Sequence, residues 1–331
     1  MSDRFSCYCR ILLLLKAAPQ RSQSILKTAM VNFEYKSYLL ALTIADFILA
    51  TLTVFGNLLL LTTIKLDPVR CLRTPATYLI ANLSLSDLFV GLIIGYGRGL
   101  VGCFMYKDEI QPSWINLAIN VAGGASIING IWTVIAMALD RYIAVTDPFH
   151  YNERITGRKV HTCIFVSWVM ATTLTAFYPL AGQIWAVILL VFSHTHFTIP
   201  VFVLLFVYCR IFCSLSARRY ELQRLTTSLS TITLRHALER ERKMALTSFV
   251  ILKLFCASFL PFYIKIQLLN FCSCQDTMAF RRFDLISHTF LYLSSFANPF
   301  MYAWRVPKFR RSLQECLHIK KRNIVRPINI N

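Results

Sequence analysis

The chain has 331 residues, of which 56% are hydrophobic and only 15% are charged, so its mean hydropathy is strongly positive. A soluble domain of this length would not tolerate such a composition, which excludes an ordinary soluble enzyme and indicates a membrane protein. The net charge of +19 would also fit a nucleic-acid-binding protein, and the positions of the basic residues must decide between the two.

Seven apolar runs follow one another along the chain, and a helix needs roughly 20 apolar residues to cross a bilayer. We predict membrane helices over residues 38–64, 76–98, 114–139, 162–180, 184–213, 244–268 and 284–304. The fifth and sixth are expected to extend past the bilayer on the cytoplasmic side. Since no internal repeat or low-complexity linker appears, the prediction is an all-α membrane protein with a seven-helix bundle at 38–304, an N-terminal segment at 1–37 and a basic tail at 305–331.

The basic residues favour the segments that would face the cytosol if the N-terminus lies outside. Of the 35 lysines and arginines, 23 fall in residues 65–75, 141–160, 210–243 and 305–331. This excess is typical of the positive-inside tendency and of attraction to anionic lipids. We therefore expect a multi-pass plasma-membrane protein that contacts lipids and not nucleic acid. The first 37 residues carry six more basic residues on the supposed outer side, and translation starting at Met30 is an alternative there.

Polar or helix-breaking residues stand at membrane depth in most of the predicted helices, where lipid makes them costly. In chain order they are Asn57, Asp87, Trp168, Pro200 with Tyr208, Pro261, and Asn298 with Pro299, while Asp140, Arg141 and Tyr142 end the third helix. A single intramembrane Asn or Pro usually packs against a neighbour or bends its helix. The whole set in this order indicates a particular protein family far more specifically than any one of these residues does.

With this set the chain resembles the rhodopsin-like (class A) G-protein-coupled receptors over about residues 38–318. Within that superfamily the stretches at 141–159 and 298–310 are most similar to the adenosine receptors. Because these stretches are mostly cytoplasmic, they bear on ancestry and coupling more than on the ligand. The resemblance implies a receptor that couples an extracellular small-molecule or lipid-like ligand to a heterotrimeric G protein.

The resemblance also implies a cytoplasmic switch. Arg141 and Glu241 would form an ion pair that closes the cytoplasmic mouth, and opening would release Arg141 toward Tyr208. The other residues assigned to the switch are Asp140, Tyr142, Phe149, Asn298, Pro299 and Tyr302. Phe149 would insert into the G protein as an apolar knob. For Arg141 and Glu241 the alternative is a helix-end charge that extends to the lipid surface.

Asp87 is an acid at membrane depth, and a buried carboxylate needs a proton, a cation or hydrogen-bond donors. The residues expected around it are Asn57, Ser126, Ser294 and Asn298. Similar receptors hold a sodium ion at this place, although Gly130 stands here where the family commonly offers a serine. A weakened sodium site and an ordered-water network are the two alternatives, and no other cofactor or metal is expected.

The outer halves of the helices concern the ligand. Gly123 occupies the family's usual amine-binding position, so an amine held there is not expected. Tyr292 stands where opsins carry their lysine, which excludes a retinal Schiff base. Phe259 and Ile266 replace the tryptophan and asparagine that adenosine receptors use, so adenosine is expected to act weakly.

Nine residues remain as candidates for pocket contacts. They are Asp46, Arg98, Asn116, Asn120, Phe259, Tyr263, Asp284, His288 and Tyr292. Asp46 and Arg98 pairing with each other is an alternative to a ligand role. Lys265 is expected to extend toward the membrane surface instead.

The usual disulfide from the third helix to the next outer loop cannot form, since the connection at 181–183 is very short and has no cysteine. Cys103, Cys272 and Cys274 are the outer cysteines left, together with Cys7 and Cys9 if the N-terminal segment is translated, and a link from Cys103 to the third outer loop is one option. Such short outer loops resemble those of melanocortin receptors. After the seventh helix, residues 307–318 are predicted to form an amphipathic helix on the membrane, in which Cys316 is a candidate for palmitoylation.

Other functions were weighed against a signalling receptor. An adenosine or melanocortin-type peptide receptor is the nearest alternative. A seven-helix transporter would show paired repeats, which the sequence lacks. A receptor-like scaffold that does not signal is a third possibility. An enzyme is not expected, because no nucleophile–base pair or metal cluster stands out.

Overall fold

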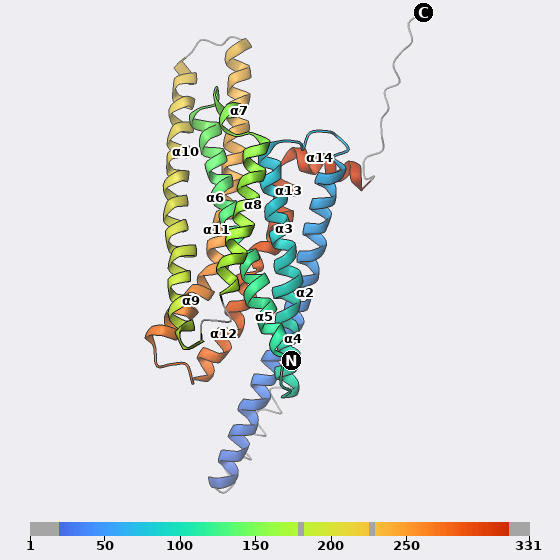
Figure 1. The fold of residues 1–331 in the computed structure, drawn as a ribbon, viewed down its shortest axis with the longest axis vertical. Helices are drawn as coiled ribbons and strands as arrows, with labels where there is room; N and C mark the ends of the chain where they lie inside the picture. Colours follow the sequence, from blue (N-terminus) through green and yellow to red (C-terminus); the bar gives the residue numbers. More distant parts are fainter. Residues whose placement is uncertain (1–19, 178–181, 225–228, 318–331) are drawn as a thin grey trace, which may run out of the picture.

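The computed structural model describes residues 20–177, 182–224 and 229–317, and side chains from residue 34 onward except at scattered positions. Within these ranges the chain is helical, and the predicted all-α seven-helix bundle with a further helix after it is confirmed (Figure 1). The segment at 1–19 and the tail beyond 317 lie outside the described residues. One end of the bundle carries the short helix α7 (Tyr151–Arg154) and the last helix α14 (Pro307–Cys316).

The first helix is α2 (Gln20–Leu66), and the fourth and sixth are α8 (Gly157–Ala176) and α11 (Leu229–Phe271). The second comprises α3 (Pro75–Phe89), a π-helical turn η1 (Val90–Gly95) and α4 (Tyr96–Lys107). The third comprises α5 (Ser113–Ala118), the π-helical turn η2 (Ile119–Gly123) and α6 (Gly124–Thr146). The fifth comprises α9 (Trp185–Ser193), the π-helical turn η5 (His194–Thr198) and α10 (Ile199–Arg224). The seventh is divided at Tyr292 into α12 (Met278–Leu291) and α13 (Leu293–Arg305).

Side-chain caps set several of the helix starts. The hydroxyls of Thr74, Thr156 and Thr277 accept hydrogen bonds from backbone N–H groups three residues later. Such caps satisfy donors that a helix start leaves free. The fourth and seventh helices therefore begin several residues before the predicted apolar runs. The first helix also begins earlier, because no Gly or Pro interrupts residues 20–37.

Five helices in the described ranges are long and apolar enough to cross a membrane by themselves, and they span Glu34–Leu66, Pro75–Lys107, Ser113–Thr146, Ala186–Glu221 and Glu241–Phe271. The helix α8 and the divided pair α12–α13 do not reach this standard, yet they pack into the same bundle. Arg282, Asp284 and His288 explain the low hydropathy of α12. Contacts with Lys265 on the sixth helix, described below, stabilise Asp284 and His288 in this position.

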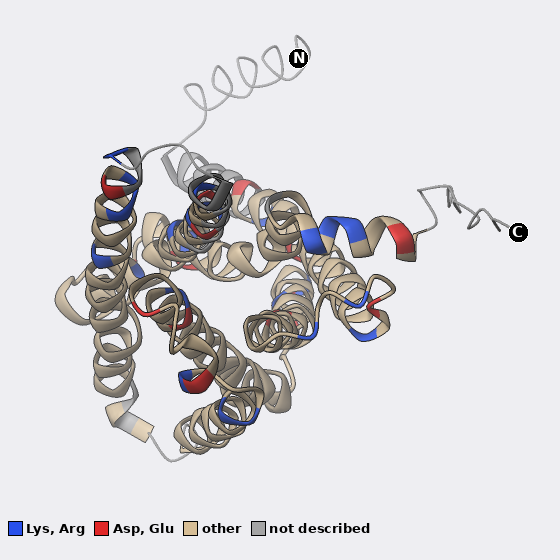
Figure 2. Cartoon of the chain, turned by 90° about the horizontal axis from the view of Figure 1, so that it is seen from above, with Lys and Arg blue, Asp and Glu red and all other residues tan. Residues whose placement is uncertain are grey.

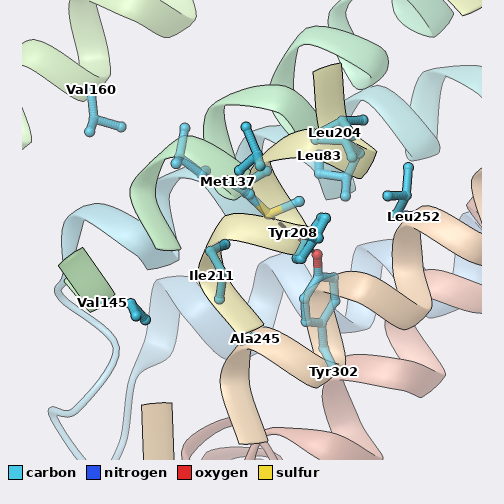
Figure 3. Close-up of a cluster of buried hydrophobic side chains, with 14 of the residues drawn as sticks. Leu83, Met137, Val145, Val160, Leu204, Tyr208, Ile211, Ala245, Leu252 and Tyr302 are labelled. Carbon is cyan, nitrogen blue, oxygen red and sulfur yellow. Dashed lines mark hydrogen bonds between the residues drawn. The ribbon is translucent and has the colours of Figure 1, made fainter. Parts of the chain in front are cut away.

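The apolar core is densest toward the end that carries α14. There Leu83, Met137, Tyr208, Ile211 and Tyr302, which come from four different helices, belong to one buried cluster (Figure 3). The outer surface of the bundle is apolar too, and large exposed side chains such as those of Phe55, Phe165, Phe202 and Phe206 suit contact with lipid. Seen from above, charged residues lie mainly on helix ends and on α14 (Figure 2).

Candidate functional site

The Arg141 side chain lies at the end of α6, where it contacts two acids. It is 8% exposed and forms an ion pair with the neighbouring Asp140, to which its Nε donates at 2.9 Å. Its Nη1 lies 3.5 Å from Glu241 Oε2 on α11. A guanidinium out of water needs such partners, since removing charge from water costs several kcal/mol per ion. The third and sixth helices are thus joined at the position that the family resemblance assigns to the switch.

The loop between the third and fourth helices adds a contact that the sequence did not indicate. Tyr151 in α7 donates a hydrogen bond from its hydroxyl to Asp140 Oδ1 at 2.7 Å. Burial and the negative charge of Asp140 raise the pKa of the Tyr151 hydroxyl, so it stays a donor. The sequence does not reveal this contact, because 11 residues separate Tyr151 from Asp140 and the chain leaves the helix between them.

The same loop presents Phe149, whose side chain is 92% exposed. Asp147 holds the loop by accepting from His150 Nδ1 at 2.8 Å and pairing with Arg154 at 2.9 Å. The hydrogen bond from His150, followed by the charges of His150 and Arg154, lowers the pKa of the Asp147 carboxyl, which stays ionised. An apolar side chain held outward in this way is available to a partner protein.

Two tyrosines of the predicted switch lie inside the apolar cluster and away from solvent. Tyr208 and Tyr302 are both 2% exposed, and the Tyr302 hydroxyl donates to Met137 Sδ at 3.6 Å (Figure 3). The Tyr208 ring packs against Phe249 with centroids 5.3 Å apart. Tyr142 packs at the edge of the cluster, and Pro299 lies buried within α13.

A cavity of about 40 Å³ lies beside Asp87 in the middle of the bundle. Ser126, Ser294 and Asn298 line it together with Asp87, and Asn298 Nδ2 donates to Asp87 Oδ2 at 2.8 Å. Asn57 does not line this cavity, because its Nδ2 donates to the backbone carbonyls of Thr53 and Ser295 at 2.9 and 3.0 Å.

The acceptors around Asp87 outnumber the donors. The buried Oδ1 atoms of Asn57 and Asn298 have no hydrogen-bond partner among the described residues. A carboxylate, two hydroxyls and an orphaned amide oxygen form a donor set that suits a hard cation such as sodium. The cavity volume also admits water, which needs about 10–15 Å³. The residues present therefore fit either alternative.

A second polar network joins the second, third and fourth helices. Asn82 accepts from Trp168 Nε1 at 2.9 Å and donates to Thr133 at 2.8 Å. Next to it, Asn129 donates to Ser86 at 2.7 Å. The sequence singled out Trp168, and its separation of 86 residues from Asn82 concealed the contact. The network satisfies its members within the bundle, so it supports packing.

The outer ends of the sixth and seventh helices enclose a charged cluster. Lys265 Nζ lies 2.9 Å from Asp284 Oδ1 and 3.3 Å from His288 Nε2. The Lys265 side chain is only 12% exposed, so the expectation that it extends toward the membrane surface was wrong. The ion pair explains the difference, because a buried ammonium is far more stable beside a carboxylate than beside lipid.

Asp46 on the first helix forms the other half of this outer region. It accepts hydrogen bonds from Thr289 at 2.8 Å and from the Tyr292 hydroxyl. Arg98 shares a cavity of only about 10 Å³ with Asp46 and interacts with it through charge, but no ion pair within 4.0 Å joins them among the described residues. The Nε atom of Arg98 is buried without a hydrogen-bond partner.

The remaining pocket candidates lie apart from these charges. Phe259 stacks on Phe197 with centroids 4.9 Å apart, and the Tyr263 hydroxyl lies 3.4 Å from His194 Nδ1. Asn116 is exposed and accepts from Asn120 through its backbone carbonyl at 2.7 Å, which places both asparagines near the outer end of the third helix. The structure thus separates the nine candidates into an ionic group, an aromatic group and a pair of asparagines.

Gly123 is the point of closest approach between the second and third helices in this region. A Cβ atom at this glycine would lie 2.6 Å from Ile94 Cγ1, well inside normal contact. Both residues lie at π-helical turns, η2 and η1, which pack against each other. A side chain at this position, acidic or otherwise, would require the Ile94 side chain to shift.

The outer cysteines and the lipidation candidate can also be placed. Cys272 and Cys274 form a disulfide with each other, and Cys103 is free, so the predicted option of a bridge from Cys103 to the third outer loop was wrong. Part of the short connection at 181–183 lies outside the described residues. Cys316 ends α14, whose Phe309 and Ser312 are buried while Lys308, Arg310 and Arg311 are exposed.

Comparisons with known proteins agree with this geometry. Residues 56–184 and 176–302 match the family model described as 7 transmembrane receptor (rhodopsin family). Trace amine-associated receptor 7a of Rattus norvegicus is 26% identical over 303 residues, with 80% of this chain and 78% of that receptor covered. Trace amine-associated receptor 7e of Mus musculus is 27% identical over the same shares. The fold resembles the crystal structure of squid rhodopsin with a TM-score of 0.74 and 20% identity, over 86% of each chain.

Proposed function

We propose that this chain, which belongs to the rhodopsin family of seven-transmembrane receptors, keeps its G-protein switch closed through Arg141 and opens it when a small ligand rearranges the outer cluster. Membership of this family makes it a G-protein-coupled receptor in a membrane, and not an enzyme. The observation that carries the proposal is the Arg141–Glu241 ion pair at 3.5 Å, which joins the third and sixth helices.

The closed state follows from where the charges lie. Asp140 is 3% exposed and holds Arg141 from within the same helix, while Glu241 reaches it from α11 with a side chain that is 23% exposed. The pair with Glu241 is therefore the contact that helix separation would break. A partly exposed ion pair contributes up to about 1 kcal/mol. Its loss would shift the balance between closed and open states by about fivefold.

The ligand proposal begins from the relatives, whose names associate them with trace amines. Here the amine-binding position is Gly123, and the contact with Ile94 leaves no room for an acid. The two outer acids, Asp46 and Asp284, already hold hydroxyl donors and an ammonium. A protonated amine would have to displace these partners, so we propose a less polar small or lipid-like ligand.

Anchors for such a ligand are the half-buried Tyr263 and His288 and the buried Tyr292. Ile266 is fully buried and offers no amide to an adenine edge. Each unmatched polar group of adenosine would cost about 1–3 kcal/mol. Adenosine should accordingly be a weak or inactive agonist, and sub-micromolar activation by it would contradict this part of the proposal.

The proposed orientation places the N-terminus outside the plasma membrane and α14 on the cytoplasmic surface. The lysines and arginines of α14 and of the loops beside it support this orientation. Palmitoylation of Cys316 would fix the end of α14 to the bilayer. At the Asp87 cavity, a sodium ion would be held by Asp87, Ser126 and Asn298, where it would supply positive charge to the buried carboxylate.

The switch is tested by measuring nucleotide exchange on purified G proteins with receptor in lipid nanodiscs and no ligand. Glu241→Gln should raise basal exchange severalfold, because it removes the charge that holds Arg141 from the sixth helix. Arg141→Ala should abolish exchange while surface expression remains. Glu153→Gln removes an exposed charge from the same face and serves as the matched control. Wild-type exchange by the Arg141 variant would refute the mechanism.

The amine argument has its own test. Gly123→Asp should lower the thermal stability of the receptor, since a side chain in this closely packed position costs about 1–3 kcal/mol. It should also fail to create a response to trace amines. If Gly123→Asp folds normally and responds to amines, the packing of Ile94 against Gly123 is not the obstacle described.

A further inference from the structure

A groove of about 680 Å³ opens between the far ends of the fifth and sixth helices, α10 and α11. These ends rise side by side beyond the rest of the bundle (Figure 1). The α10–α11 groove is lined by Leu215, Arg219, Arg235, Leu238, Glu239, Arg242, Lys243 and Leu246. It is much larger than the cavities at Asp87 and Asp46, and neither the switch nor the ligand proposal uses it.

The charge of the groove is strongly unbalanced, with four cations against one acid. Arg219, Arg242 and Lys243 are exposed, and their charged side chains make no hydrogen bond or ion pair with any described residue. Cations held around one concavity repel one another unless an anion lies between them. These cations come from two helices, α10 and α11, so a bound anion would contact both helices.

The groove is not the cytoplasmic mouth that Arg141 closes. Successive residues of an α-helix are about 100° apart around its axis. Glu239 and Lys243 each stand two residues from Glu241, so they lie on nearly the opposite face of α11. Since Glu241 points at Arg141, the groove opens on the side turned away from the third helix.

The groove lies where the apolar stretches of α10 and α11 end. The stretch of the fifth helix that is long and apolar enough to cross a membrane ends at Glu221, and that of α11 begins at Glu241. Arg219, Arg242 and Lys243 therefore stand at the boundary, and the buried Leu215 with the half-buried Leu246 forms an apolar floor between them. A ligand in the groove would therefore contact both positively charged and apolar side chains.

We propose that the α10–α11 groove binds the phosphorylated inositol headgroup of an anionic phospholipid of the cytoplasmic leaflet. Phosphate groups satisfy several cations at once, and a lipid enters from the side on which the groove opens. The leucines would contact the glycerol and the first carbons of the acyl chains. The inference rests on the proposed orientation, which puts this end of the bundle in the cytosol. By bridging α10 and α11, the headgroup would hold their spacing.

The test titrates purified full-length receptor in uncharged detergent with a short-chain phosphatidylinositol bisphosphate, and binding is followed by native mass spectrometry. The triple variant Arg219→Gln/Arg242→Gln/Lys243→Gln should bind about a hundredfold more weakly, since each basic residue near anionic lipid contributes about fivefold. The matched control Lys65→Gln/Arg70→Gln/Arg158→Gln removes three exposed charges from the same end and should change affinity less than twofold. Should the triple variant misfold, Lys243→Gln alone should lose about fivefold.

The other outcomes would overturn the proposal. Equal losses in the groove and control variants would mean that surface charge alone attracts the lipid. Equally tight binding of soluble inositol trisphosphate would assign the groove to a free phosphate compound. If the groove variant keeps lipid affinity but loses G-protein exchange, the groove is a protein-docking face. The Arg141→Ala receptor should bind the lipid as wild type does, which separates this inference from the switch mechanism.

Discussion

Substitution of Gly130 by serine should reveal which of two occupants the Asp87 cavity holds. Gly130 lines this cavity from the third helix. A Cβ atom there would meet Leu83 Cδ1 at 3.8 Å and Ser86 Cβ at 3.9 Å, which are ordinary contacts. Serine therefore fits without strain, and it would restore the hydroxyl that the family commonly offers at this position.

Two effects of the substitution can be separated by size. In a helix interior Ala is more stable than Gly by about 1 kcal/mol, and Ser is more stable than Gly by about half that. The serine hydroxyl adds a further oxygen for a cation, which is worth about 1 kcal/mol and raises sodium affinity about fivefold. Gly130→Ala supplies the helix effect without the oxygen and is the matched control.

Thermal unfolding of the purified receptor in sodium chloride and in choline chloride measures both effects without a known ligand. A cation that binds only the folded state stabilises it by an amount that grows with its concentration and affinity. Gly130→Ala should raise the melting temperature equally in the two salts. Gly130→Ser should raise it more in sodium, and Asp87→Asn should remove the sodium dependence. If the serine and alanine variants respond alike to sodium, the cavity holds ordered water and the cation assignment is wrong.

Two further predictions concern hydroxyl groups beside buried carboxylates. Tyr151→Phe removes the donor to Asp140, worth about 1 kcal/mol, and should raise basal nucleotide exchange about fivefold or less; unchanged exchange would mean that the loop does not restrain the switch. Tyr292→Phe and Thr289→Val each remove one donor from Asp46 and should lower thermal stability by about 1–3 kcal/mol. Only Tyr292→Phe should also alter basal exchange, because Tyr292 lies at the junction of α12 and α13, and equal exchange in the two variants would contradict that role.

The seven helices could be predicted because hydropathy alone decides what crosses a bilayer. Their interruptions could not, since π-helical turns such as η1 and η2 have no residue signature in this chain. At the division of the seventh helix, the Tyr292 hydroxyl contacts Asp46, 246 residues away, and the sequence gives no sign of this contact. The helix starts at Thr156 and Thr277 were predictable in principle, because threonine is a favoured capping residue.

For the candidate sites, sequence reasoning succeeded where the family resemblance implied the pairing. Arg141 lies near the end of α6 and Glu241 lies within α11, and the structure brings them together. It failed for Lys265, whose direction depends on the rotation of the sixth helix against the seventh. Asp284 lies 19 residues later in the chain, and only that rotation places it 2.9 Å from the lysine.

The seventh helix joins the outer cluster to the switch through consecutive contacts. Tyr292 donates to Asp46 at the outer end, Asn298 donates to Asp87 in the middle, and Tyr302 donates to Met137 next to the cytoplasmic mouth. Each contact ties α13 or its start to a different helix. Coupling between distant sites requires an element with two arrangements that both sites can bias. The helix α13 is where such an element is expected, because Tyr292 separates it from α12 and Pro299 removes one backbone donor within it.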